Sequence, residues 1–451
     1  MKKNIILFFA WLLPYGLVNA IDLFEAYQKS LSFNADYLKA VANNDAGQEN
    51  PNIARAAILP QINVNASLTE NYISATGIYA FYHQPIYAAQ LNQVVFDFSK
   101  FSTLTRSKFS SQLATLQLEN ARQQLMVNVA QAYFDVLYAE DVLLATQMTE
   151  KALEQQLIQA KEAFQVGTVP IVDVNDAQAA YDASAAQEIQ DENNLIYKKN
   201  IFRNLTGLNP DLIQPLQKEI DLKLPVPEDS NSWAQMAESG NLNIKIADKQ
   251  VAMAKEDITI ARSGHLPTLN LMAQYMYQDT GSVDNTNANA ADSQIQSIAN
   301  VPGSPLSSYT VGYVGLQLSV PISSGGGINA QTRQAAAVYE SSTQQLVSVE
   351  RQTDQDIRNA YWNVANGVNF VLAQKAALKS AKTKLDSDRL GYQVGIRNSV
   401  NLVSAQKDYF QSFKEYQMSR YKYLMAEVQL QYLSGVIDEK FLQQINANIK
   451  Q

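Results

Sequence analysis

The 451-residue sequence predicts a mixed fold, in which the strands of a membrane β-barrel accompany a long α-helical coiled coil and two internal repeats supply both parts. Three observations support this prediction. A turn motif occurs twice, as FQVGTVPIVDV at 164–174 and as YQVGIRNSVNL at 392–402. Apolar residues recur every seven positions over long stretches without proline, as in helices that wind around one another. Short segments alternate apolar and polar residues, which is typical of strands that separate two environments.

The first segment of the chain is typical of a removable signal peptide. Lys2 and Lys3 precede the apolar stretch 5–13, and Val18 to Ala20 offer the small residues that a signal peptidase recognises. A membrane anchor is the alternative, but so short an apolar stretch cannot span a bilayer, which needs about 20 residues. We therefore expect residues 1–20 to be removed and the mature chain to start at Ile21.

Composition argues against several classes of function. The chain has no cysteine, so it has neither disulfides nor a cysteine for N-terminal lipid attachment. Its formal net charge is −8, and no basic patch marks a nucleic-acid partner. His83 and His265 are the two histidines, each isolated in the sequence. We therefore expect no metal site, no other cofactor and no enzyme built on a histidine-activated nucleophile.

Each repeat contains one predicted β-hairpin. The first is expected at about 60–96, with a connecting loop near 72–86. The second is expected at about 267–320, with a longer polar outer loop at about 280–308. Strands of an ordinary soluble sandwich are the alternative interpretation. Because four strands cannot close a barrel, the membrane interpretation requires an oligomer.

Tyrosines gather near the ends of these predicted strands. Such rings are typical of the aromatic girdle of a membrane barrel. The tyrosines are Tyr72, Tyr79, Tyr82, Tyr87, Tyr275, Tyr277, Tyr309 and Tyr313.

The rest of each repeat is predicted to be helical. Each repeat is expected to begin with a helix that precedes its hairpin. Long helices are expected at about 99–166 and 327–394, and returning helices at about 170–206 and 399–433. Gly167 and Gly395 stand where helix ends prefer glycine, so the two Val-Gly pairs should form tight turns. The seven-residue series is Ile357, Val364, Val371, Leu378, Leu385 and Tyr392, and its counterpart in the first repeat is Val129, Val136, Leu143, Glu150, Leu157 and Phe164.

These features together resemble the outer-membrane efflux protein family. The paired turns, the segments LPQINV and LPTLNL that lead from helix to strand, and QVVFD at 93–97 carry the resemblance. It implies a homotrimer in the outer membrane of a Gram-negative bacterium. Three subunits with four strands each would build one twelve-stranded barrel in the outer-membrane lipid, continued by a helical tunnel across the periplasm.

The resemblance also implies a function and partners. The protein would be the passive exit duct of a tripartite multidrug efflux system, a type I protein secretion system, or both. A periplasmic adaptor would connect it to an inner-membrane pump of the RND, ABC or MFS type. The sequence alone does not choose between efflux and secretion, because the pump sets the substrate. A structural or adhesive trimeric coiled-coil protein of the cell surface is the alternative function.

The expected organisation follows the two repeats. An equatorial linker would separate them and, with the C-terminal tail, form a belt around the tunnel. The segments are the signal peptide 1–20, repeat 1 at 21–208, the linker 209–240, repeat 2 at 241–435 and the tail 436–451.

The resemblance assigns gate roles to four residues. Polar links between helices hold the periplasmic end of such tunnels closed. Tyr392 and Arg397 match the tyrosine and arginine of the second repeat's inner coil, and Asp173 matches the aspartate that receives the arginine. Glu162 stands at the position that faces the tyrosine, where glutamine is more typical. Alternatively, Tyr392 merely ends an apolar stripe and Arg397 is solvated.

The pore constriction departs from the family pattern. Asn401 and Ser404 stand where the family's type member carries two aspartates that narrow the closed pore and attract cations. Asp408 shares their helix face, so it is the nearest remaining candidate for a lumenal carboxylate. The family's cation block is therefore in doubt here.

The helix turns are the expected docking sites for the adaptor. They comprise Val166, Gly167, Val394 and Gly395.

Overall fold

The computed structural model describes residues 20–75, 78–279, 283–285, 308–447 and 449. The chain divides into two compact units that do not follow the sequence repeats. Unit 1 combines Met1–Val41, Leu118–Ile244 and Glu350–Gln451, and unit 2 combines Ala42–Gln117 and Lys245–Val349. Each unit therefore takes segments from both repeats. Of the expected signal peptide, only Ala20 lies within the described residues.

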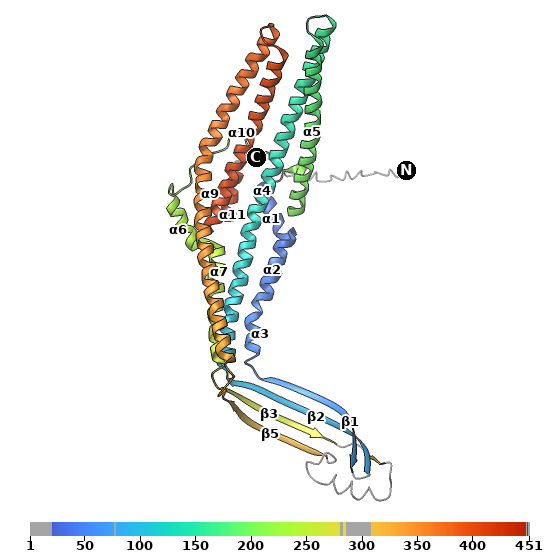
Figure 1. Ribbon diagram of the computed structural model, residues 1–451, viewed down its shortest axis with the longest axis vertical. Coiled ribbons are helices and arrows are strands. Elements are labelled where there is room, and N and C mark those ends of the chain that lie inside the picture. The colour runs from blue at the N-terminus through green and yellow to red at the C-terminus, as the bar shows by residue number, and fades with distance from the viewer. Residues whose placement is uncertain (1–19, 76–77, 280–282, 286–307, 448, 450–451) are drawn as a thin grey trace, which may run out of the picture. The chain divides into compact units, whose positions relative to one another are not determined.

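Two long helices each contribute to both units. They are α4, Phe98–Gln165, and α9, Gly327–Gln393. These bounds agree closely with the expected ranges of about 99–166 and 327–394. The returning helices are α5, Ile171–Thr206, and α10, Ser399–Ser434. In unit 1, α4 with α5 and α9 with α10 form two antiparallel helix pairs (Figure 1).

The linker and the tail add short helices to unit 1. They are the 3-10 helix η1 at Pro210–Leu212, α6 at Ser230–Gly240 and α11 at Glu439–Asn446. Helix α6 packs against α10, and α11 packs against α1, Leu23–Phe33. The single helix expected at the start of repeat 1 is instead broken, because Asn34 caps a new helix start by accepting from the amide of Tyr37. The segments that follow α1 are α2, Ala35–Gln48, and α3, Asn50–Ala56, while α7, Leu242–Ser263, opens repeat 2.

The core of unit 1 forms along the predicted seven-residue stripes. Val129, Val136, Ile357 and Val364 are each at most 1% exposed. Aromatic residues from several elements fill the space between the helices, because large rings bury the most apolar area per side chain. These residues include Tyr27, Tyr133, Phe134, Phe202 and Tyr423.

Unit 2 contains one antiparallel sheet of the order β1-β2-β3-β5. Its main strands are β1, Gln61–Ala75, β2, Ile78–Phe96, β3, Thr268–Gln278, and β5, Tyr309–Ser319. The β2–β3 pair joins the two repeats, with Leu91 opposite Ala273. The two edges are β1 from repeat 1 and β5 from repeat 2.

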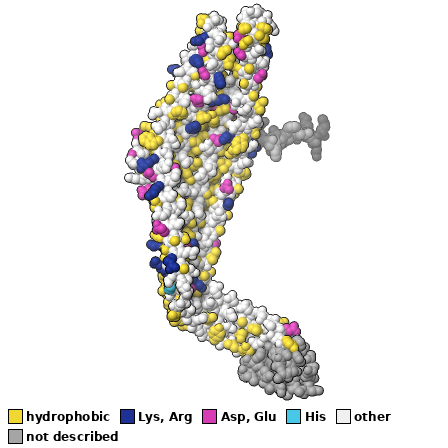
Figure 2. Space-filling view, viewed as in Figure 1, with side chains coloured by type: hydrophobic (Ala, Val, Ile, Leu, Met, Phe, Trp, Pro, Cys, Tyr) yellow, Lys and Arg dark blue, Asp and Glu magenta, His cyan; other side chains and the backbone are white. Residues whose placement is uncertain are grey.

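The sheet has one apolar face and one polar face. Ile62, Val64 and Leu68 of β1 alternate with Asn63, Asn65 and Ser67, and the register continues the same alternation across the other strands. Val64 is 78% exposed and Val314 of β5 is 75% exposed. Hydrophobic side chains gather over the strands in Figure 2. No second sheet covers them among the described residues, so the sandwich alternative is wrong.

The structure corrects two expectations about the strand ends. Most of the loop expected near 72–86 is strand, because β1 runs to Ala75 and β2 starts at Ile78. The β-branched and aromatic residues in this segment are compatible with a strand, and the pairing of β1 with β2 selects it. In the outer loop at 280–308, a short strand β4, Val283–Asn285, pairs with β2, while 286–307 lie outside the described residues.

The expected aromatic girdle is only partly formed on one face. Tyr87 and Tyr277 stack on the apolar face, with ring centroids 6.4 Å apart. Tyr313 instead lies opposite Gln274 on the polar face, where its hydroxyl donates to the Gln274 amide oxygen over 3.1 Å. A period of two sends neighbouring tyrosines to opposite faces, so closeness in the sequence does not make a girdle. The side chains of Tyr79 and Tyr82 lie outside the described residues.

The described helices include no candidate for crossing a membrane, since none combines enough length with enough apolar character.

Candidate functional site

The two Val-Gly turns have closely similar backbones. Gly167, after α4, has a φ of +73°, and Gly395, after α9, has a φ of +77°. A side chain would strain this left-handed conformation, which explains why both copies of the motif need glycine. In the second turn the amide of Ile396 donates to the carbonyl of Gly391 over 2.8 Å. The turn is thereby closed by the backbone itself, and α10 can return antiparallel to α9.

Apolar side chains at both turns face solvent in the single chain. Val166 is 75% exposed, Val394 is 60% exposed and Ile396 is 81% exposed. Exposed apolar groups that cluster at one feature mark an interaction surface. The assignment of the turns to adaptor docking stays a prediction that this exposure supports.

Arg397 pairs within its own helix pair. Its Nε lies 3.3 Å from Oδ1 of Asp388, whose residue is 7% exposed. Asp173 lies in the first turn of α5 and is half-buried. Among the described residues of one chain, no ion pair joins Arg397 to Asp173. The expected Arg397–Asp173 link therefore stays a prediction, and Asp388 is a partner that sequence reasoning missed.

Tyr392 is half-buried and lines a groove of about 430 Å³ between α4, α9 and α10. Gln156 and Arg389 also line this groove, whereas Glu162 is exposed and is not among its lining residues. Gln156 is 4% exposed, and its Oε1 has no hydrogen-bond partner among the described residues. Within one chain Tyr392 therefore shares its groove with Gln156. The expected placement of Glu162 opposite Tyr392 stays a prediction.

The constriction residues lie along the first turns of α10. The side chain of the N-cap residue Asn398 accepts from the amide of Asn401 over 3.0 Å. Asn401 is half-buried, whereas Ser404 and Asp408 are exposed. Asp408 Oδ2 lies 2.6 Å from Nζ of Lys384 on α9, and this hydrogen bond raises the pKa of Lys384. The negative charge of Asp408 is thus offset inside the chain, which weakens it as a replacement for the missing aspartates.

A buried polar cluster joins α10 to α4 and to the linker. Asp141 Oδ2 accepts from the Gln417 amide over 2.9 Å and from the Tyr421 hydroxyl over 2.8 Å. Arg420, which is 4% exposed, donates to Gln417 Oε1 over 2.7 Å and to the carbonyl of Gln217. Burial raises the pKa of Asp141, and the bond from Tyr421 opposes that rise. Buried polar groups need such partners, so this cluster holds three segments together.

A second cluster lies nearer the turns. Thr146 of α4 donates to Asp191 Oδ2 of α5 over 2.6 Å. Lys414 of α10 donates to the Thr146 hydroxyl over 2.8 Å, and its Nζ lies 3.5 Å from Asp191. These contacts connect the two helix pairs of unit 1 through side chains from three helices.

Glu427 is an acid held in a poorly solvated place beside the linker. The hydroxyl of Tyr423 lies 2.8 Å from its Oε1 and 2.9 Å from the carbonyl of Lys223. Desolvation by burial raises the pKa of Glu427 to about 7, against the opposing effect of the bond from Tyr423. Its protonation therefore changes near neutral pH.

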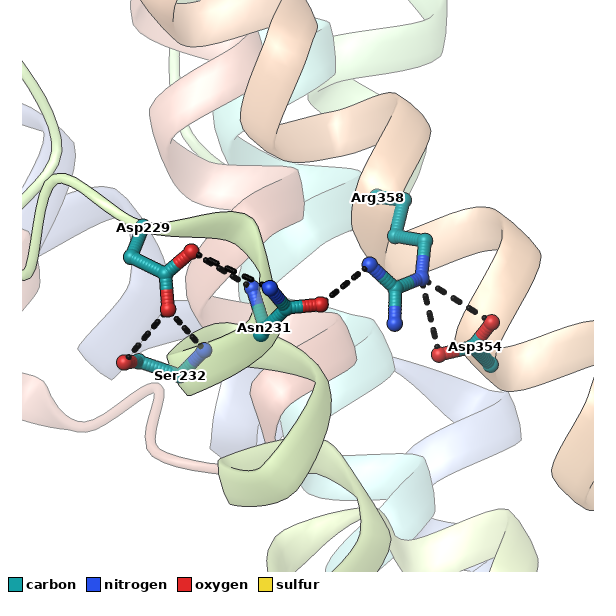
Figure 3. A network of polar contacts seen from close by, with 5 residues as sticks. All are labelled: Asp229, Asn231, Ser232, Asp354 and Arg358. Atoms are coloured by element: carbon teal, nitrogen blue, oxygen red, sulfur yellow. Dashed lines mark hydrogen bonds and ion pairs between the residues drawn. The ribbon is translucent and has the colours of Figure 1, made fainter.

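A third polar network, drawn in Figure 3, ties the linker helix α6 to α9. Asp229 caps α6 by accepting from the amides of Asn231 and Ser232, over 3.2 and 3.0 Å. Arg358 of α9 donates to Asn231 Oδ1 over 2.9 Å and pairs with Asp354 at 3.0 Å. The hydrogen bond from the Asn231 amide, together with those from the hydroxyl and amide of Ser232, lowers the pKa of Asp229, as expected for a helix N-cap.

Among the residues that the structure describes, no group of three His, Asp or Glu side chains has the arrangement of a metal site.

The arrangement of helices, turns and sheet matches a known family. The model of the outer membrane efflux protein family matches residues 26–208 and 233–436. The chain belongs to this family. Membership confirms the resemblance drawn from the paired turns, and it confirms an efflux protein located in the Gram-negative outer membrane. The members of the outer membrane efflux protein family that it resembles are channel proteins rather than enzymes.

Individual relatives extend this result. The outer membrane protein TolC of Escherichia coli (strain K12) is 32% identical over 96% of this chain and 85% of its own length. The proteases secretion protein PrtF of Dickeya chrysanthemi is 25% identical over 99% of this chain and 95% of its own length. The CmeC outer membrane channel of Campylobacter jejuni has the same fold, with a TM-score of 0.75 at 16% identity, over 95% of this chain and 90% of that one.

Proposed function

We propose that three copies of this chain form the exit duct of a tripartite export system. Each copy contributes its four main strands to one barrel in the outer membrane and its helices to a periplasmic tunnel. A periplasmic adaptor docks at the turns and couples the duct to an inner-membrane pump. The duct moves its cargo passively and carries out no enzymatic step.

The observation that carries this proposal is the sheet. One face exposes aliphatic side chains such as Val64 and Val314, and the other presents amides such as Asn65 and Gln274. A strand set between lipid and a watery lumen requires this alternation. The edge strands β1 and β5 each pair on one side within the described chain, and four strands are too few to close a barrel. Pairing β5 of one copy with β1 of the next would satisfy both edges.

The turns supply the second line of support. At the periplasmic end we assign Arg397, Tyr392, Asp173 and Glu162 to the links that close the entrance. Asn401 and Ser404 form its constriction. Each exposed polar link is worth about 0.2–1 kcal/mol, so three symmetric copies make a closure that an adaptor can overcome with replacement contacts.

Efflux and protein secretion use the same duct with different pumps. The relatives named above include TolC, the outer membrane protein, and PrtF, which is named for the secretion of proteases. The TolC relative is the more similar in sequence, at 32% against 25% identity. Because the matching family model is named for efflux, we propose drug efflux as a main role and protein secretion as an additional one.

Two measurements test the duct. Purified protein should run as heat-sensitive trimers on gels and should conduct ions in planar lipid bilayers. Deletion of its gene should sensitise cells to detergents, dyes and hydrophobic antibiotics, and expression of the chain should restore resistance. Soluble rods without conductance would favour the adhesive coiled-coil alternative. If the protein conducts ions but deletion of its gene leaves susceptibility to these compounds unchanged, its role would be restricted to dedicated secretion.

A further inference from the structure

Asp388 is a buried carboxylate beside the proposed gate. It lies in the last turns of α9, and its residue is 7% exposed. Burying a carboxylate is costly unless a cation or hydrogen bonds compensate its charge. Arg397, whose Nε lies 3.3 Å from Asp388 Oδ1, supplies that cation. Lys384, one turn earlier on α9, is engaged by Asp408. Arg397 is thus the cation in direct contact with Asp388, while Lys384 acts on it through a weaker electrostatic interaction.

Gly391 makes room for this pair. A Cβ at Gly391 would lie 2.7 Å from Cγ of Arg397, so the arginine stem lies directly on the bare backbone of α9. The amide of Arg397 also donates to the carbonyl of Gly391 over 3.1 Å. Backbone and stem together set the direction in which the guanidinium leaves the turn.

The contact leaves part of the guanidinium free for another partner. A guanidinium carries five N–H donors in a rigid fork, and the contact to Asp388 uses Nε. The Arg397 side chain remains 54% exposed, whereas that of Asp388 is 10% exposed. One edge of the fork is therefore held by a buried acid, while about half of the arginine side chain stays accessible to another partner. Such a fork is preorganised for a carboxylate on another helix pair or another copy.

We propose that Asp388 is a positioning residue of the gate, which holds Arg397 in the orientation that its closing contact requires. This inference rests on the proposed function, because it presumes an entrance closed by Arg397. Asp388 does not itself bridge to the neighbouring helix pair. It acts through Arg397, and its removal leaves the arginine able to sample orientations that miss the closing carboxylate.

Single-channel conductance in planar bilayers tests this role. We would compare the unmodified trimer with Asp388→Asn, Arg397→Ala and the double variant. Asp388→Asn should raise the resting conductance by at least half of the increase that Arg397→Ala produces. In the Arg397→Ala background, Asp388→Asn should add nothing further. Asp386→Asn is the matched control, because Asp386 is an exposed acid on the same turn of α9, and it should leave conductance unchanged.

Non-additivity separates positioning from a structural role. If Asp388 merely stabilised the end of α9, Asp388→Asn would raise conductance in the Arg397→Ala background as well. Additive effects of the two substitutions would therefore overturn the inference. A conductance of Asp388→Asn, or of Arg397→Ala, equal to that of the unmodified trimer would also overturn the inference. Trimers on gels must persist in every variant. Failure of the unmodified protein to conduct at all would reject the duct itself, and that outcome is distinct from those that reject only Asp388.

Discussion

The degree of burial decides how single residues act at the proposed gate. Asp388 and Arg397 are both charged, yet one is nearly covered and the other half-exposed. Burial also governs Glu427, where desolvation raises the pKa of the carboxyl group to about 7 from the ordinary 4.5. The neutral form of Glu427 is favoured in the folded state, so the folded chain binds a proton more tightly than the unfolded chain does.

The raised pKa of Glu427 predicts a pH dependence of stability. Its contribution is fully present below about pH 4.5 and is lost as the pH rises to about 7. Glu427→Gln should remove this loss and raise the free energy of unfolding at pH 8 by about 3 kcal/mol. Thermal unfolding in detergent, followed by circular dichroism at pH 5 and pH 8, measures the effect. Glu415→Gln, an exposed acid on the same helix, is the control; equal pH dependence in both variants would contradict the assignment.

At the scale of elements, polar clusters decide how the helices hold together. The seven-residue stripes of α4 and α9 supply apolar contact along much of their length but no fixed register between neighbours. Arg420 adds that register, because its bonds to Gln417 and to the Gln217 carbonyl join α10 to the linker, while Gln417 bonds to Asp141 on α4. Directional hydrogen bonds permit one alignment where apolar contacts permit several.

Replacing Arg420 should therefore destabilise this junction. Arg420→Met keeps the apolar stem but leaves the Gln217 carbonyl and the Gln417 side chain without their donor. We expect a loss of about 2–3 kcal/mol in the free energy of unfolding, since buried groups lose charged hydrogen bonds. Chemical denaturation of the purified protein measures the loss. Lys422→Met changes an exposed cation on the same helix and should cost much less; similar losses in the two variants would argue against the junction.

At the scale of the whole molecule, the proposed trimer would multiply what a single chain carries. Asn401 and Ser404 have no charge, and the charge of Asp408 is offset by Lys384, whose Nζ lies 2.6 Å from the Asp408 carboxylate. Threefold repetition of this set would bring little negative potential to the proposed entrance. Threefold repetition of new aspartates would concentrate negative charge in a narrow, poorly screened space.

Divalent cations test this reading of the entrance. The unmodified channel should respond weakly to divalent cations added on the periplasmic side of a planar bilayer. Asn401→Asp with Ser404→Asp should install a block at concentrations at least tenfold lower. Strong block of the unmodified channel by divalent cations would contradict the prediction that Asn401 and Ser404 leave the entrance with a weak cation filter. Asp408→Asn would then show whether Asp408 supplies the block despite its pairing.

Local patterns in the sequence determined the elements of this protein. Glycine at 167 and 395 is required by a left-handed backbone, and a period of seven or of two reflects burial along one helix stripe or one sheet face. Each of these signals lies within a few neighbouring residues. Strand ends were less predictable, because the local sequence of 72–86 suits a loop or a strand until a partner strand is present.

The tertiary structure alone decided which polar groups meet. Asp388 and Arg397, or Lys384 and Asp408, come together only after the α9–α10 turn has folded one helix back on the other. The same holds for the β2–β3 pairing that joins the two repeats into one sheet. Partners of a salt bridge or a strand are selected by distance in space, and many acids and bases along the chain satisfy the chemistry equally well. The sequence by itself therefore determined helices, turns, strands and family, whereas the packing of helix on helix determined the partner of Arg397.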